Sequence, residues 1–133
     1  MAGFTKYMQE LALNWVKGST FAAAPAAVYL GLFTTAPADD NSAGTEVSTS
    51  GSAYARKAIT LGAVSGTNTS SMSNSAKVDF GVSTSAWGDL VAFGVYDAVT
   101  DGNLLMWNGI STVTVGVGND VEFAIDALTL TVA

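Results

Sequence analysis

Apolar residues alternate with small or polar residues along most of the chain, and this period of two is typical of β-strands. The segments with this pattern are Ala26–Thr35, Ala53–Leu61, Lys77–Phe80, Trp87–Asp97, Leu104–Trp107, Ile110–Val117 and Val121–Val132. Turn-forming residues separate them. The pattern predicts a mainly β fold, an antiparallel β-sandwich or jelly-roll-like domain of about seven or eight strands.

The stretch Trp87–Ile110 predicts a hairpin at the centre of this domain. Its two apolar runs are joined by Thr100–Asn103, which contains Asp-Gly, a strong signal for a tight turn. Parts of both runs are apolar on both faces, as is Ala26–Thr35. We therefore expect these strands in the middle of a sheet system.

The last apolar segment changes its parity at Asp126-Ala127, which predicts a β-bulge within one strand. Two other segments, 36–52 and 62–76, are long and rich in Ser, Thr, Asn and Gly. The first reads as a loop. Part of the second is suited to an edge strand, because Thr and Ser tolerate a solvated β surface.

Phe4, Met8, Leu11 and Trp15 recur at spacings of four, three and four, which is one face of a helix. We predict a helix over Phe4–Lys17 that ends at Gly18. Its apolar stripe packs either on the protein's own sheet or on a neighbouring subunit. The chain is thus divided into a helix and link, residues 1–25, and a β-sandwich domain, residues 26–133.

Composition excludes several function classes. Charged residues make up 12% of the chain, about half the usual share, and the net charge is −6. The five basic residues form no stripe that tracks phosphates, so we expect no nucleic-acid partner. No apolar run approaches the ~20 residues of a membrane span, and the N-terminus lacks the pattern of a secretory signal.

No residue pattern predicts catalysis, a cofactor or a metal. The chain has no Cys and no His, which removes thiolate and imidazole chemistry. Most carboxylates stand at turn positions, where Asp favours the turn itself. Two acidic groups offer oxygen ligands to calcium but lack EF-hand spacing: Asp39-Asp40-Asn41, and Asp97 with Asp101 and Asn103. We predict that the protein is not an enzyme.

The large aromatic residues and one arginine leave alternatives open. Aromatics build a core, line a subunit interface or stack on sugars; the relevant ones are Trp15, Trp87, Trp107, Tyr29, Tyr54 and Tyr96. Arg56 either points outward from a strand or pairs with an acid, Glu46 or one of a neighbouring subunit.

Several segments in order resemble a family of small tailed-phage virion proteins. They are Val28–Pro37, Gly44–Val47, Gly51–Arg56, Trp87–Gly88, Phe93–Ala98, Gly102–Leu105, Gly118–Phe123 and Leu128–Thr131. Members are known as tail fibre proteins and as capsid decoration or cement proteins. The resemblance covers Ala26 to Ala133 and leaves the N-terminal helix outside. It implies a β-domain without catalytic residues.

The resemblance implies a structural virion protein, assembled in the host cytoplasm. We expect first a capsid decoration or cement protein that stabilises the shell; a tail fibre or baseplate component is the alternative, and a carbohydrate-binding module is an alternative of another class. The expected partners are the major capsid protein or other virion proteins and further copies of the chain, with a trimer favoured. Expected interface residues are Phe4, Met8, Leu11, Trp15, Arg56 and Trp87.

Overall fold

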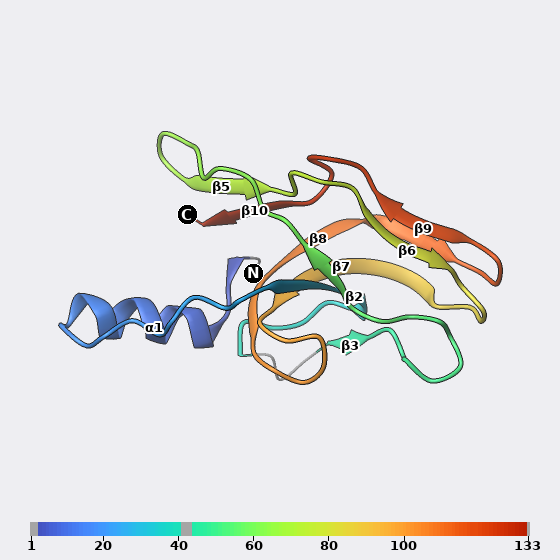
Figure 1. Cartoon of the computed structure of the whole chain (residues 1–133), viewed down its shortest axis with the longest axis horizontal. Helices are drawn as coiled ribbons and strands as arrows, with labels where there is room; N and C mark the ends of the chain where they lie inside the picture. The colour runs from blue at the N-terminus through green and yellow to red at the C-terminus, as the bar shows by residue number, and fades with distance from the viewer. Residues whose placement is uncertain (1–2, 41–43, 133) are drawn as a thin grey trace.

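A computed structural model describes residues 3–40 and 44–132, and these residues form a mainly antiparallel β structure with one helix (Figure 1). In chain order the elements are β1 (Gly3–Phe4), α1 (Lys6–Val16), β2 (Val28–Thr35), β3 (Thr45–Glu46), β4 (Lys57–Ile59), β5 (Ser70–Ser73), β6 (Val78–Val82), β7 (Gly88–Tyr96), β8 (Leu104–Val115), β9 (Asp120–Phe123) and β10 (Thr129–Val132). The predicted fold class is confirmed.

The strands form one large sheet and two ribbons. The large sheet has the order β1-β8-β7-β2-β3, and β4 also pairs with β2. The ribbons are β10–β5 and β6–β9, and in Figure 1 both lie along one side of the large sheet. Apolar side chains of the ribbons and of the sheet make one core cluster between these two layers.

The two central strands are apolar on both faces, as predicted. Leu30 and Leu32 of β2 are fully buried in the core between the layers. Phe33 of β2 points to the opposite face, where it joins Tyr96 and Trp107 in a second buried cluster. Because strand side chains alternate between faces, this double burial places β2 and β7 at the centre of the sheet.

The helix is shorter than predicted, because its first two expected residues are held by the sheet. Phe4 lies in β1 and pairs with Met106 of β8. The Thr5 hydroxyl donates to the Leu104 carbonyl oxygen at 2.5 Å, and the Thr5 backbone N–H donates to that of Leu105 at 3.0 Å. The chain is therefore anchored on β8 before α1 begins at Lys6.

The second half of the hairpin is one strand rather than two. β8 continues through Gly109, where the sequence predicted a separation. Leu90 pairs with Val113 but Ala92 pairs with Gly109, so three residues of β8, 110–112, lie opposite the single residue Val91 and form a bulge. On β7 itself, Leu90 and Phe93 belong to the same core cluster despite the odd spacing between them, so the alternation of side chains is interrupted beside this bulge.

The bulge predicted at Asp126-Ala127 is wrong. The segment is two strands, since β9 pairs with β6 and β10 pairs with β5. Asp126 between them has a φ of 64°, the left-handed conformation that ends a strand. The parity change therefore marks a passage from one ribbon to the other.

The long polar segments contain short strands. β3 lies within the predicted loop 36–52 and pairs with β2. β5 lies within 62–76 and pairs with β10 at the outer side of its ribbon, so the predicted edge strand is confirmed. The strand predicted over Ala53–Leu61 is reduced to the three residues of β4.

Candidate interaction site

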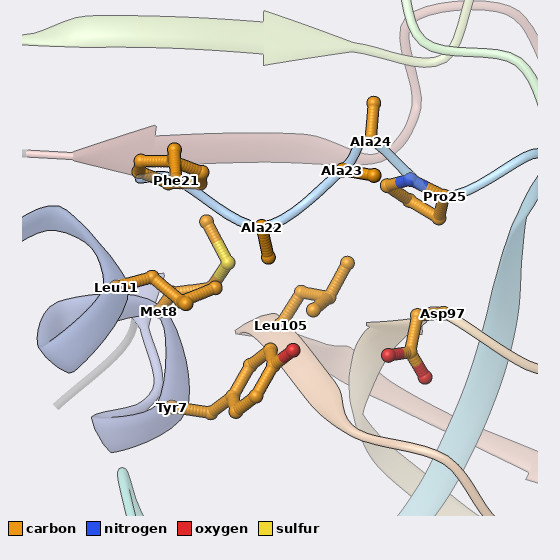
Figure 2. Close-up of a pocket in the computed structure, with 10 residues that line it drawn as sticks. All are labelled: Tyr7, Met8, Leu11, Phe21, Ala22, Ala23, Ala24, Pro25, Asp97 and Leu105. Carbon is orange, nitrogen blue, oxygen red and sulfur yellow. The ribbon is translucent and has the colours of Figure 1, made fainter. Parts of the chain in front are cut away.

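The N-terminal arm, residues 6–27, comprises α1 and the link that returns to β2. In Figure 1 it extends away from the β layers. Tyr7, Met8 and Leu11 of α1 point toward the link (Figure 2). With Phe21, Ala22–Pro25, Asp97 and Leu105 they line a cavity of about 390 Å³. The link therefore covers one face of α1, loosely.

The large apolar residues at the C-terminal end of α1 are exposed. No residue of α1 is buried. Leu13 is 69% exposed, Trp15 61% and Val16 74%. A polar strip of Lys6, Glu10, Asn14 and Lys17 runs along the helix at spacings of four, four and three, with Lys6 and Glu10 ion-paired. A helix that is apolar over most of its circumference is usually buried on most of it.

The helix also lacks the devices that stabilise an isolated helix. It has 11 residues, and its N-cap residue, Thr5, makes no side-chain hydrogen bond to it. Its first turn has no acidic residue and its last turn no basic one. Helices shorter than ~12–15 residues are marginal in water. Leu13 and Val16, three positions apart, share one face, whereas Trp15 lies on the side of Met8 and Leu11. These three exposed side chains make the C-terminal end of α1 a candidate interaction surface.

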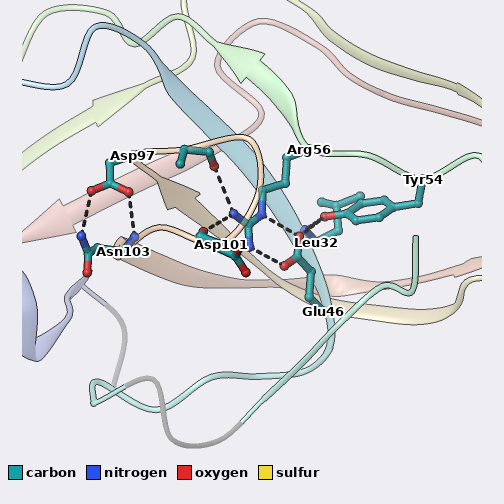
Figure 3. Close-up of polar contacts among 8 residues, drawn as sticks. Leu32, Glu46, Tyr54, Arg56, Asp97, Asp101 and Asn103 are labelled. Atoms are coloured by element: carbon teal, nitrogen blue, oxygen red, sulfur yellow. Dashed lines mark hydrogen bonds and ion pairs between the residues drawn. The ribbon is translucent and has the colours of Figure 1, made fainter. Parts of the chain in front are cut away.

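A separate, polar group of residues around Arg56, called here the Arg56 clamp, lies on the large sheet (Figure 3). The Arg56 guanidinium grips the Glu46 carboxylate with two hydrogen bonds, Nε to Oε2 at 2.9 Å and Nη2 to Oε1 at 2.8 Å. The Arg56 Cζ lies 3.4 Å from the centre of the Tyr96 ring. The Tyr54 hydroxyl donates to Glu46 Oε2 at 2.6 Å and accepts from the Leu32 backbone N–H at 3.0 Å.

The clamp fixes the hairpin loop between β7 and β8. Arg56 Nη1 donates to the carbonyl oxygens of Ala98 at 3.0 Å and Asp101 at 2.7 Å. The Asp97 carboxylate accepts from the Asn103 backbone N–H at 2.7 Å and from its side-chain amide at 3.0 Å. Every charged group of the clamp is thus satisfied within the chain, which indicates a structural role.

The clamp alters the acid–base properties of its members. Burial raises the pKa of Tyr96 to about 12, and the negative charge of Glu46 adds to this. Burial and the hydrogen bond to Glu46 raise the pKa of Tyr54 far above its ordinary value. Burial acts to lower the pKa of Arg56, but its bonds to Glu46 raise it overall. At neutral pH both tyrosines are therefore uncharged, and Arg56 carries its positive charge.

The structure separates the six predicted interface residues. Phe4 lies in the sheet, and Met8 and Leu11 are half-buried beside the link. Trp15 is exposed. Arg56 is engaged by Glu46, so of its two alternatives the pairing with an acid is the one observed. The helical stripe read from the sequence does not include Leu13 and Val16, which lie off its spacing of four, three and four. Their exposure became visible only once the structure showed which face of α1 the link covers.

Trp87 lies in the core. It is 5% exposed, and its indole N–H donates to the Ser52 carbonyl oxygen at 2.8 Å. Trp107 is 8% exposed. These two rings therefore offer almost no surface to a neighbour or to a sugar, whereas Trp15 does.

Among the described residues, the acidic side chains of the two calcium hypotheses do not converge on a common cation position. Asp97 accepts N–H groups from Asn103, as described, and Asp39 accepts the Trp107 indole N–H at 3.3 Å; Asn41 lies outside the described residues. Pairing of β6 with β9 brings together three exposed carboxylates that the sequence did not single out, Asp79, Asp120 and Glu122. Desolvation and its acidic neighbours, Asp79 first, raise the pKa of Asp120.

A family model described as "Podophage GP4 fiber I protein gp80" matches residues 3–131. The chain belongs to this family. The match includes α1, so the expectation that the helix lies outside the family pattern is wrong. A search of curated proteins found no match. In the described part of the chain, no helix has the length and apolarity needed to cross a membrane.

Proposed function

We propose that the protein is a structural subunit of a phage fibre, located in the virion, which acts through protein–protein contacts and without catalysis. The observation that carries this proposal is the uncovered, uncharged apolar face of α1 on a protein of a fibre family. Such a face is a contact surface rather than a site for chemistry. Capsid decoration, the first expectation from the sequence, gains no direct support from the family description.

We further propose that the subunit forms a homo-oligomer, with a trimer favoured, and contacts other virion proteins. A net charge of −6 spread over the surface keeps copies apart except where an apolar contact outweighs the repulsion. Light scattering of the purified protein tests this, with an expected mass of three times 13.5 kDa. A mass equal to one chain contradicts it.

The experiment that tests the fibre role is a count of copies per purified particle by quantitative gel electrophoresis. A fibre subunit is present in a small number of copies, whereas a shell decoration protein is present in hundreds. Labelling of particles with an antibody against this chain gives the location independently. Absence from the particle, or label distributed over the capsid, contradicts the fibre role.

A further inference from the structure

The apolar face of the arm has a counterpart on the same molecule. An apolar groove of about 300 Å³ lies between β1, β8 and the β5–β10 ribbon. Its lining contains no charged residue and includes Phe4, Val64, Met72, Met106, Leu130 and Val132. Val64, at the rim, is 66% exposed. The groove therefore presents apolar surface to solvent, as the arm does.

From these two surfaces we infer that the exposed end of α1 in one copy docks in the groove of a second copy, with Leu13 and Val16, which share one helix face, inserted into it. This inference deepens the proposed function, because it names the contact through which the subunits of the fibre assemble. In Figure 1, α1 and the β5–β10 ribbon extend toward the same side of the molecule. Copies that meet at this side each offer an arm and a groove, so one kind of contact covers both apolar surfaces.

Charge complementarity favours contact between the arm of one copy and the body of another. The arm carries Lys6, Glu10 and Lys17, a net charge of +1. The rest of the chain carries the other ten acidic and three basic residues, a net charge of −7. Contact between two bodies is therefore repulsive and contact between two arms weakly so, whereas contact of an arm with a body is attractive.

Each copy has one arm and one groove, so the contact is either exchanged reciprocally within a pair or repeated head to tail from copy to copy, which is the heterologous arrangement. Heterologous contacts generate rings when the rotation between copies closes. Three copies form the smallest closed ring of this kind, in keeping with the trimer proposed above.

Site-specific photo-crosslinking of the purified full chain tests the inference. A benzophenone amino acid replaces Leu13, which is 69% exposed, so folding is preserved. The control carries the same group at Asn14, on the polar strip. Trypsin separates the arm helix, residues 7–17, from the groove segments in 58–77 and 78–133. Mixing ¹⁵N-labelled with unlabelled chain identifies crosslinks between copies.

We expect a dimer band from the Leu13 variant, with crosslinks to 64–72, 104–106 or 130–132, and a band at least several-fold weaker from the control. Crosslinks only between two helix peptides, crosslinks only within one chain, or no dimer band overturn the inference. None of these outcomes changes the number or location of copies on the particle, so the fibre role is judged separately.

A second pair of variants tests the groove. Val64→Asp places a charge at its rim, and we expect at least a tenfold loss of oligomer by light scattering. Val117→Asp is the matched control, because Val117 is 71% exposed and lies in the turn between β8 and β9, away from the groove. Equal oligomer in both variants overturns the inference.

Discussion

At the scale of single residues, the most consequential side chain is Arg56. Its fork joins β3, through Glu46, to the hairpin loop, through the carbonyl oxygens of Ala98 and Asp101, and its plane covers the ring of Tyr96. Lysine has the charge but neither the fork nor the plane, so it cannot make these contacts together. The Arg56 side chain is only 10% exposed, and Glu46 is 23% exposed.

Replacement of Arg56 therefore destabilises the fold. We expect Arg56→Ala to lower the free energy of unfolding by about 2–4 kcal/mol in urea denaturation, because Glu46 is left partly buried without its cation. Lys77→Ala is the matched control, since Lys77 pairs with Glu122 at 3.3 Å with both side chains about half exposed. An exposed pair is worth about 0–1 kcal/mol. Equal losses in the two variants contradict the structural role of the clamp.

The buried phenols of the clamp predict a loss of stability in alkali. Folding raises the pKa of Tyr96 to about 12, above the value near 10 of an unfolded chain. The folded state therefore favours the neutral ring, so this contribution is complete below pH ~10 and is lost as the pH rises through about 12. Urea denaturation across this window measures the loss.

The Tyr96→Phe variant serves as the comparison for this pH dependence. It cannot ionise at this position, so we expect a smaller loss of stability between pH ~10 and about 12 than in the parent chain. A loss remains in the variant, because Tyr54 is shifted in the same direction. Indistinguishable slopes for the variant and the parent show that Tyr96 does not titrate as described.

At the scale of elements, the close approach of β2 to the clamp depends on a glycine. A Cβ on Gly31 would lie 2.9 Å from the Tyr96 ring and 3.2 Å from a carboxylate oxygen of Glu46. The missing side chain makes the space in which the Tyr96 ring and the Glu46 carboxylate lie over the sheet. Strand β2 therefore carries no side chain at position 31, and Tyr96 and Glu46 occupy the space that a side chain would fill.

We expect Gly31→Ala to lower the free energy of unfolding by about 1–3 kcal/mol, the usual cost of overpacking. Gly109→Ala is the control within the same sheet, because its Cβ would have 3.8 Å to the nearest atom, the Val91 carbonyl oxygen. Thermal or urea denaturation of both variants measures the difference. A variant at Gly31 as stable as that at Gly109 contradicts the tight contact.

At the scale of the whole molecule, the β body and the arm differ in how well their side chains are packed and paired. The described residues include no buried side-chain nitrogen or oxygen without a hydrogen-bond partner. The core lies between the large sheet and the two ribbons, and the clamp closes the opposite face. The arm, by contrast, leaves most of its apolar residues in solvent, which is why we propose that it acts in assembly.

The sequence by itself determined the fold class, the doubly apolar central strands and the hairpin of β7 and β8, although a loop of residues 97–103 joins the two strands in place of a tight turn. These features are local, because each depends on residues close together in the sequence: the period of two in the strands, the Asp-Gly between apolar runs, and the helical period of α1. It also raised the pairing of Arg56 with Glu46 as one of two alternatives.

Only the tertiary structure decided which side chains remain exposed and which strands pair. The end of the chain divides between two ribbons because β9 and β10 have partners far away in sequence, β6 and β5. Trp87 and Trp15 are the same residue type, yet one is buried and the other exposed. Burial depends on what packs against a residue, and that partner is set by long-range pairing, which no local pattern encodes.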